Sequence, residues 1–216
     1  MAGGGPHGSG RFFSFEGIDG SGKSTQARFL QAALAKRGVE AILTREPGGS
    51  PGAEEIRNLL LEGGADRWSP RTEILLFTAA RRDHLERTIL PALHRGAVVI
   101  TDRFADSTRA YQGLARNGGE DLRTLVDNLH DLMIGMEPDL TFLIDLPPEK
   151  GLARATARGA GEQRFEEMGL DLQQRLRAEF LDLARATPER FALFDGAREE
   201  GDLAADILAH ALDVLT

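Results

Sequence analysis

The chain has 216 residues, no cysteine, and 34 acidic against 26 basic side chains, which give a formal net charge of −8. This charge repels polyanions and argues against an extended nucleic-acid-binding surface, and the lack of cysteine excludes a disulfide scaffold or a thiolate metal site. The length fits one domain with a large core, and no apolar run reaches the ~18 residues that a membrane-spanning helix needs.

The first ten residues are rich in glycine and lack the charged and apolar regions of a signal peptide. Residues 1–10 are therefore predicted to be a disordered arm. Residues 11–216 are predicted to form a single domain, because no linker, repeat or second core interrupts them. The absence of cysteine agrees with a cytoplasmic location.

A short apolar strand at residues 12–16 leads into a glycine-rich turn and then into an amphipathic helix that ends before Gly38. The turn fits the P-loop pattern G-x-x-x-x-G-K-[ST], whose backbone N–H groups surround phosphate oxygens. Lys23 would supply a positive charge to the β- and γ-phosphates of ATP, and the Ser24 hydroxyl a Mg²⁺ ligand. The predicted ATP-binding residues are Gly17, Ile18, Asp19, Gly20, Ser21, Gly22, Lys23, Ser24 and Thr25.

The rest of the chain alternates strands with helices. Further strands are predicted at residues 39–44, 97–101, 140–144 and 191–194. Ser50-Pro51 and Ser69-Pro70 begin two helices, of which the second is expected to be broken or bent near Pro91. Other helices are predicted at residues 106–115, 120–136 and 203–215, with two more between residues 148 and 186. This order predicts an α/β fold, with a five-stranded parallel sheet covered by helices on both faces.

Charged side chains follow the predicted strands at the edge of the sheet where such folds bind ligands. Arginines and carboxylates that meet a P-loop at this edge predict a phosphoryl-transfer site. These residues are Asp19, Arg45, Asp102, Arg103, Asp145 and Asp195.

Four segments beyond the P-loop are similar to those of one enzyme family. They are Thr44-Arg45-Glu46-Pro47-Gly48-Gly49, Ala79-Ala80-Arg81, Asp102-Arg103 through Ser107 to Ala110-Tyr111-Gln112-Gly113, and Pro138-Asp139-Leu140-Thr141. With them the chain resembles the thymidylate kinases, which transfer the γ-phosphoryl group of ATP to dTMP, from Arg11 to Leu215. The resemblance implies a P-loop NTPase fold like that of nucleoside-monophosphate kinases, ATP as donor, Mg²⁺ as cofactor, and a homodimer.

The resemblance also assigns roles at the acceptor site. Arg103, together with Arg45, would hold the acceptor phosphate, since guanidinium groups suit bidentate phosphate contacts. A surface salt bridge is the alternative for Arg45. Asp19 would meet the sugar 3′-hydroxyl and, indirectly, the Mg²⁺ shell, or else turn its charge to water. Asp102 would bind Mg²⁺ through water, with a structural role as its alternative.

For the base, the resemblance implies that Phe77 stacks on thymine. Arg81, four residues later on the same helix face, would donate to the O4 carbonyl. A core position is the alternative for Phe77. Tyr111 would crowd the sugar 2′ carbon and exclude ribonucleotides, while Ser107 and Gln112 would complete the pocket.

Some thymidylate kinases carry an arginine inside the P-loop, and this chain does not. The resemblance instead implies a lid at about residues 154–166. Its arginines Arg154, Arg158 and Arg164 would act as catalytic cations besides Lys23 and Arg103. Gln163 stands where an acidic residue is usual, and a solvated helix face is the alternative for the cluster.

Two other functions remain open at this point. Another deoxynucleotide or deoxynucleoside kinase would share the P-loop, although a nucleoside acceptor would make Arg45 unnecessary. A nucleotide-dependent switch protein is disfavoured, because the chain has no Asn-Lys-x-Asp guanine motif. The helices around residues 70–85 and 106–132 are candidates for a dimer interface, but periodicity alone does not separate an interface from a core. Neither a nucleic acid nor a membrane is a predicted partner.

Overall fold

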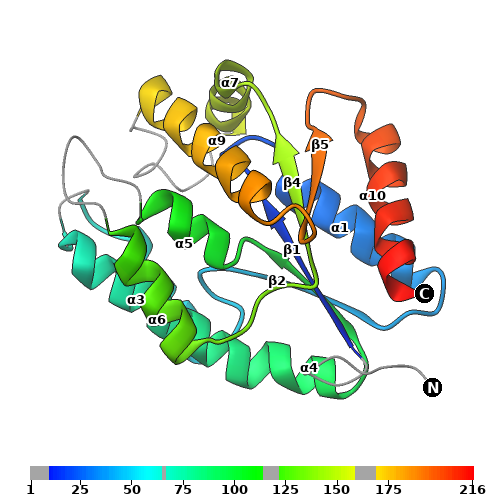
Figure 1. The fold of residues 1–216 in the computed structure, drawn as a ribbon, viewed down its shortest axis with the longest axis horizontal. Coiled ribbons are helices and arrows are strands. Elements are labelled where there is room, and N and C mark those ends of the chain that lie inside the picture. The colour runs from blue at the N-terminus through cyan, green and yellow to red at the C-terminus, as the bar shows by residue number, and fades with distance from the viewer. Residues whose placement is uncertain (1–9, 65–66, 114–121, 159–168) are drawn as a thin grey trace.

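A computed structural model describes residues 10–64, 67–113, 122–158 and 169–216, and for residues 155–158 the backbone alone. Figure 1 shows a central sheet between two layers of helices. All neighbouring strands run parallel, in the order β2-β3-β1-β4-β5, which confirms the predicted five-stranded α/β fold. The strands are β1 Arg11–Glu16, β2 Ala41–Arg45, β3 Val98–Asp102, β4 Leu140–Asp145 and β5 Phe191–Asp195.

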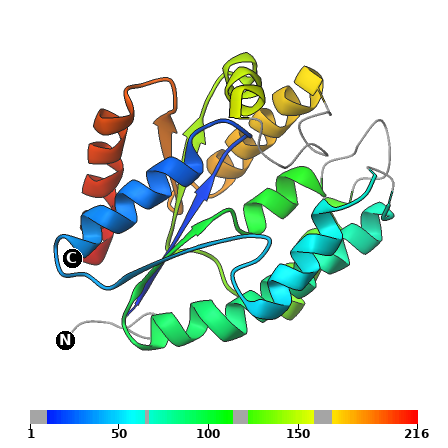
Figure 2. The ribbon, with the colours of Figure 1, turned by 180° about the vertical axis from the view of Figure 1, so that it is seen from behind.

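Helices α1 (Lys23–Ala35) and α10 (Glu200–Leu215) cover one face of the sheet (Figure 2). A larger layer covers the other face, and α7 (Pro148–Arg158) follows β4 beside the P-loop. The larger layer contains α2 Pro51–Leu61, α3 Pro70–His84, α4 Leu90–His94, α5 Ala105–Tyr111, α6 Arg123–Met133 and α9 Gly169–Ala186. No helix in these described ranges has both the length and the apolar character needed to cross a bilayer.

Alternate residues of β1 point to opposite faces of the sheet, as the period of a strand requires. Phe13 and Phe15 pack in the core under α1 and α10, while Phe12 packs on the other face, where its ring meets Phe104 edge-on at 4.9 Å. Glu16, four residues after Phe12, points to the same face of the sheet. Its fully buried carboxylate is therefore directed to the side of the sheet that carries α5.

The long helix predicted from Ser69-Pro70 is present in three pieces. Ser69 caps it, since its Oγ accepts from the N–H of Thr72 at 3.2 Å. A π-helical turn, Leu85–Ile89, then separates α3 from α4. This wider turn comes just before Pro91, which has no N–H to donate, so the regular helix is interrupted near the predicted position.

Several boundaries differ from prediction by a few residues, and two of them have a clear cause. The helix α5 ends at Tyr111 rather than near residue 115, because the N–H groups of Gln112 and Gly113 both donate to the carbonyl of Thr108 at 3.0 Å and close the last turn. The strand β2 begins two residues later than expected, since Val39 still donates to the carbonyl of Leu34. Of the predicted arm, the described part is Gly10, whose N–H donates to the carbonyl of Leu93 at 3.2 Å.

Candidate active site

The P-loop connects β1 to α1 at the carboxyl end of the sheet. Gly20 has a φ of +77°, and a Cβ there would lie 2.0 Å from the carbonyl oxygen of Gly151 in α7, so only glycine fits. Lys23 is buried, and its Nζ donates to the carbonyl of Ile18 at 2.8 Å. Burial first, and then the charge of Arg103, lower the pKa of Lys23 to about 8. The ammonium group is thus held inside a loop built to receive phosphate oxygens.

Ser24 and Asp102 meet beside the P-loop. Ser24 Oγ donates to Asp102 Oδ2, whereas Asp102 Oδ1 is buried and has no hydrogen-bond partner among the described residues. A hydroxyl and a carboxylate oxygen are ligands that Mg²⁺ accepts. Among the described residues, no group of three or more His, Cys, Asp or Glu side chains is placed so that it could hold a metal ion. These two residues therefore fit the metal of a Mg²⁺–ATP site.

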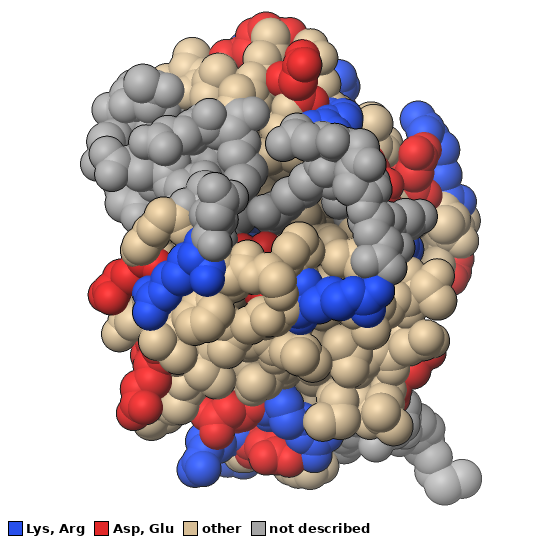
Figure 3. All heavy atoms as spheres, turned by 90° about the vertical axis from the view of Figure 1, so that its left-hand side faces the viewer, with Lys and Arg blue, Asp and Glu red and all other residues tan. Residues whose placement is uncertain are grey.

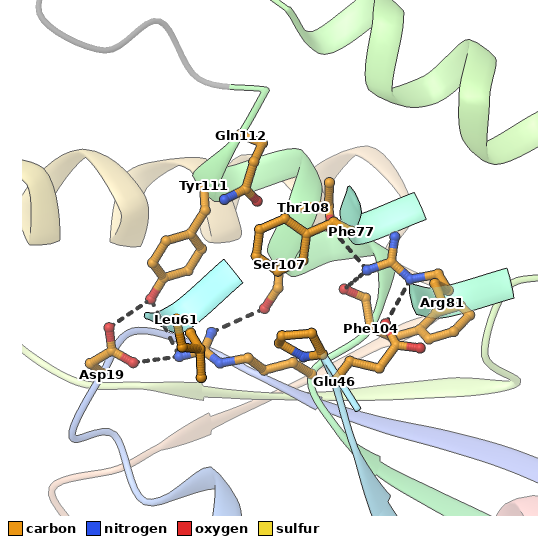
Figure 4. Close-up of a pocket in the computed structure, with 12 residues that line it drawn as sticks. Asp19, Glu46, Leu61, Phe77, Arg81, Phe104, Ser107, Thr108, Tyr111 and Gln112 are labelled. Atoms are coloured by element: carbon orange, nitrogen blue, oxygen red, sulfur yellow. Dashed lines mark hydrogen bonds and ion pairs between the residues drawn. The ribbon is translucent and has the colours of Figure 1, made fainter. Parts of the chain in front are cut away.

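A pocket next to the P-loop brings together nearly all the residues predicted to bind the acceptor (Figure 4). They come from the P-loop, from α3, and from the segment that runs from the end of β3 through α5. Elements distant in sequence therefore converge on one site. The predicted residues that line this acceptor pocket are Asp19, Phe77, Arg81, Arg103, Ser107, Tyr111 and Gln112.

Arg103 forms the centre of the pocket's polar wall. Its Nη2 makes an ion pair with Asp19 Oδ1, and its Nη1 donates to Ser107 Oγ at 3.0 Å. The Tyr111 hydroxyl donates to Asp19 Oδ2 at 3.0 Å (Figure 4). Arg103 also has a φ of 71°, a left-handed backbone conformation that residues with a Cβ rarely adopt. Such strain is typical of functional sites, and with the hydrogen bonds it sets the direction of the guanidinium group.

The charges in this wall keep Asp19 ionised. Burial alone would raise the pKa of Asp19, but the positive charges of Arg103 and Lys23 outweigh it and hold that pKa below its ordinary value. Burial raises the pKa of Tyr111, so its phenol keeps the proton that it donates to Asp19. Asp19 is therefore a carboxylate acceptor among cations, suited to a sugar hydroxyl beside a phosphate.

Arg81 and Phe77 form the inner end of the pocket. Arg81 is 4% exposed, and its Nε donates to Glu46 Oε2 at 2.7 Å. Its Nη2 donates to the Phe104 carbonyl at 3.1 Å and to Thr108 Oγ1 at 2.8 Å. Phe77 is only half-buried and lines the same pocket, so it is not part of the fully buried core. At this end of the pocket Phe77 therefore supplies an apolar wall and Arg81 a polar one.

Arg45 lies apart from the acceptor pocket. Its side chain is 56% exposed and makes a salt bridge with Glu54 at 3.0 Å. It lines a second hollow together with Ser24 and Asp102. The structure thus does not bring Arg45 and Arg103 into one pocket, and the contact seen for Arg45 is the surface salt bridge that was its alternative.

Most of the predicted lid lies outside the described residues, including Gln163 and Arg164. Arg158 ends α7, but its side chain is outside the description as well. Arg154 is described, and its Nη1 donates to the Gly196 carbonyl, in the turn after β5, at 3.1 Å. The roles of the three arginines stay predictions.

Glu16 is a site residue that the sequence analysis misses. Its Oε1 accepts from the N–H groups of Phe104 and Ser107 at 2.7 and 3.3 Å, and its Oε2 accepts from Ser107 Oγ at 2.7 Å. This carboxylate from β1 thereby holds the start of α5 next to Arg103. Burial, followed by the charge of Asp106, raises the pKa of Glu16 to about 7. The sequence did contain a signal for this role. Glu16 is an acidic residue at the end of an apolar strand, and it shares a strand face with Phe12.

This raised pKa has a consequence for stability. Below pH 4.5, the ordinary pKa of this side chain, Glu16 is protonated in both the folded and the unfolded protein. Above about pH 7 the folded protein must hold a buried carboxylate charge. At about 1.4 kcal/mol per pKa unit, Glu16→Gln should gain on the order of 3 kcal/mol of unfolding free energy relative to wild type between pH 5 and pH 8. Urea unfolding at several pH values measures this difference.

The control is Glu54→Gln. Burial would raise the pKa of Glu54, but the N–H of Gly49 and the charge of Arg45 outweigh it and hold the pKa below its ordinary value. Glu54 therefore stays ionised from pH 5 to pH 8 without a histidine partner, and the difference between this variant and wild type should be flat over that range. A flat difference for Glu16→Gln as well would contradict the raised pKa.

Glu46 and Gln173 are two further residues that the sequence analysis did not assign to the site. Glu46 lines the acceptor pocket and pairs with Arg81. Gln173 of α9 is 3% exposed, and it contributes to the lowered pKa of Asp19. Glu46 lies inside a segment that carries the resemblance, but the direction of its side chain does not follow from the sequence.

Comparison with known proteins agrees with this geometry. The family model described as thymidylate kinase matches residues 15–207. The chain is 67% identical over 201 residues to a thymidylate kinase of Dinoroseobacter shibae, covering 93% of this chain and 96% of that protein, and 66% identical to one of Ruegeria pomeroyi, covering 93% of each. The crystal structure of thymidylate kinase from Ehrlichia chaffeensis has a TM-score of 0.75 and 34% identity, and covers 94% of this chain and 99% of that one.

These similarities extend over almost the whole chain and include every element that lines the acceptor pocket. The chain is an ATP-dependent phosphotransferase that converts dTMP to dTDP. It belongs to the thymidylate kinase family.

Proposed function

We propose that dTMP binds in the acceptor pocket and receives the γ-phosphoryl group of ATP held on the P-loop. The observation that carries this proposal is the contact between Arg103 and Asp19, which joins the acceptor pocket to the loop that contains Lys23. Phosphoryl transfer requires the two nucleotides to be in line and the developing charge to be met by cations. Arg103 on the acceptor side and Lys23 on the donor side supply both conditions.

The inner end of the pocket provides base recognition. Phe77 offers a ring for stacking, and Arg81 offers a guanidinium donor for the O4 carbonyl of thymine. Cytosine carries an amine at that position, which would meet a donor with a donor. A site that hydrogen-bonds one substrate group discriminates strongly against analogues that lack it.

The middle of the pocket suits a deoxyribose. The ionised Asp19 can accept from the 3′-hydroxyl, and the buried Tyr111 ring occupies space beside the sugar. A 2′-hydroxyl would have to be desolvated against this ring without a partner. Ser107 and Gln112 line the same part of the pocket.

Ser24 and Asp102 would hold Mg²⁺, Asp102 through water. When bound, this ion neutralises charge on the β- and γ-phosphate oxygens. The chain's own residues orient the phosphates through the P-loop N–H groups and Lys23. Arg154, Arg158 and Arg164 are proposed to add a further cation at the transferring group, in place of a P-loop arginine.

We infer a homodimer from the surface formed by α3 and α6. Leu75 is 55% exposed, Leu132 79% and Met133 43%, and Figure 3 shows a broad uncharged area on this side of the molecule. A two-fold axis would pair this area with itself. Sedimentation equilibrium distinguishes the 23.5 kDa chain from twice that mass and so tests the inference. A cytoplasmic location stays a prediction.

An acceptor panel tests the proposed function. Purified protein with ATP should release ADP with dTMP, and much more slowly with UMP, dCMP or thymidine, and removal of Mg²⁺ should stop the reaction. Thymidine is the decisive acceptor, because it keeps the base and sugar but has no phosphate for Arg103. If thymidine reacted as fast as dTMP, the phosphate assignment would be wrong and a deoxynucleoside kinase would fit better.

A further inference from the structure

The guanidinium group of Arg81 is held on two of its three nitrogens. Nε is bound by Glu46, and Nη2 by the Phe104 carbonyl and Thr108 Oγ1. Within the described part of the chain Nη1 has no partner, and Figure 4 shows it without a contact at the pocket. Nη1 is therefore the nitrogen left to donate to a base, and its direction depends on the groups that bind Nε and Nη2.

Glu46 is the charged member of that support. It is 5% exposed, and its Oε2 lies 2.7 Å from Arg81 Nε while its Oε1 lies 3.0 Å from His84 Nδ1. Burial alone would raise the pKa of Glu46, but Arg81 and His84 outweigh it and hold that pKa below its ordinary value. Both carboxylate oxygens are engaged, so the carboxylate cannot rotate without losing a partner.

The chain of contacts continues behind Glu46. His84 is fully buried, and its Nε2 lies 2.8 Å from Thr44 Oγ1. His84 thus contacts Glu46 through one ring nitrogen and Thr44 through the other. Glu46, His84 and Thr44 thus form one continuous support that runs from the end of β2 to α3.

Gly49 packs directly against the contact between His84 and Thr44. A Cβ at Gly49 would lie 2.4 Å from both His84 Nε2 and Thr44 Oγ1, and its φ is +86°. The loop is tied down by Thr88, whose Oγ1 donates to the Gly49 carbonyl at 2.7 Å. Any side chain at residue 49 would separate His84 from Thr44. The contact between His84 and Thr44, neither of which lines the acceptor pocket, therefore requires a glycine at residue 49.

We propose that Glu46 is a positioning residue for base recognition, which through His84 and Thr44 fixes Arg81 so that Nη1 faces the base. The inference rests on the proposed binding of thymine at Arg81. It differs from a merely structural buried ion pair, because a structural pair would change stability without changing which base is accepted. Glu46 itself need not touch the substrate.

The test uses Glu46→Gln, which keeps the shape of the side chain, removes its charge, and leaves one acceptor oxygen where Arg81 Nε and His84 Nδ1 now have one each. We expect the KM for dTMP to rise at least about tenfold, the KM for ATP to stay within about twofold, and the preference for dTMP over dCMP to fall by about tenfold or more. The matched control is Glu137→Gln, because Glu137 also bridges an arginine and a histidine, Arg109 and His130, and does not line the pocket. It should lose stability and keep both KM values.

Arg81→Ala provides the double-mutant cycle. If Glu46 acts through Arg81, adding Glu46→Gln to Arg81→Ala should not reduce the base preference further.

Should Glu46→Gln fail to fold, Glu46→Asp keeps the charge on a shorter side chain, and we expect the same change in base preference at smaller size. A Glu46 variant that unfolds more easily but keeps its KM for dTMP and its base preference would overturn the inference. Loss of the base preference in Arg81→Ala, but not in the Glu46 variants, would leave the proposed function intact. If Arg81→Ala kept its base preference, the proposed base site itself would be wrong.

Discussion

Replacing Lys23 with methionine is expected to lower kcat by about 10²- to 10³-fold, the loss typical when one donor to a developing negative charge is removed. Lys23 is the cation inside the P-loop, and the oxygens that it meets gain charge in the transition state. Methionine fills much of the same space, so the loop keeps its packing. Burial already disfavours the charge on Lys23, and we therefore expect the variant to unfold at a temperature close to that of wild type.

Steady-state kinetics at saturating ATP and dTMP measure the effect, and thermal unfolding verifies the fold. Lys36→Met is the matched control, because Lys36 is exposed at the other end of α1. It should leave kcat unchanged. If Lys23→Met kept more than about a tenth of kcat, about 1.4 kcal/mol or less would be left for the P-loop lysine, and its catalytic assignment would be wrong.

The features that the sequence predicted best are local ones. The P-loop, with the strand before it and the helix after it, occupies one stretch of chain, and its glycines and lysine carry their mechanical reasons with them. The five-stranded parallel sheet follows from strands that alternate with helices, whereas the strand order was not predicted. The interruption of the helix before Pro91 was predictable for the same reason, because the missing N–H acts within one turn of helix.

The features that were missed depend on where a side chain points after folding. Glu16 contacts Ser107, 91 residues away, and Glu46 contacts Arg81, 35 residues away. An acid at the end of an apolar strand is visible in the sequence, but its partner is not. The salt bridge between Arg45 and Glu54 is likewise not visible in the sequence, and the phosphate-binding role of Arg45 stays a prediction. Strand ends can be counted along a sequence, whereas side-chain directions need the packed helices.

Replacing Arg103 is the second change expected to have a large effect. Its guanidinium group bridges Asp19 and Ser107 and is the cation that faces the acceptor phosphate in the proposed complex. We expect Arg103→Ala to lower kcat/KM for dTMP by about 10³-fold or more, comparable to arginines that stabilise phosphoryl transfer in other enzymes. Arg103→Lys should recover little of this, because an ammonium group cannot reach both partners in the planar geometry.

The left-handed backbone at Arg103 makes it possible to separate chemistry from strain. Alanine keeps the Cβ that makes a φ of 71° unfavourable, whereas glycine relieves it, so Arg103→Gly should be more stable than Arg103→Ala by about 1 kcal/mol. Both variants lack the guanidinium group and should lose the same kcat/KM. Arg45→Ala, whose side chain lies outside the acceptor pocket, is the comparison for charge alone. If Arg45→Ala lost more activity toward dTMP than Arg103→Gly, the acceptor phosphate would bind in the hollow beside Ser24 and Asp102, and the pocket assignment would have to be reversed.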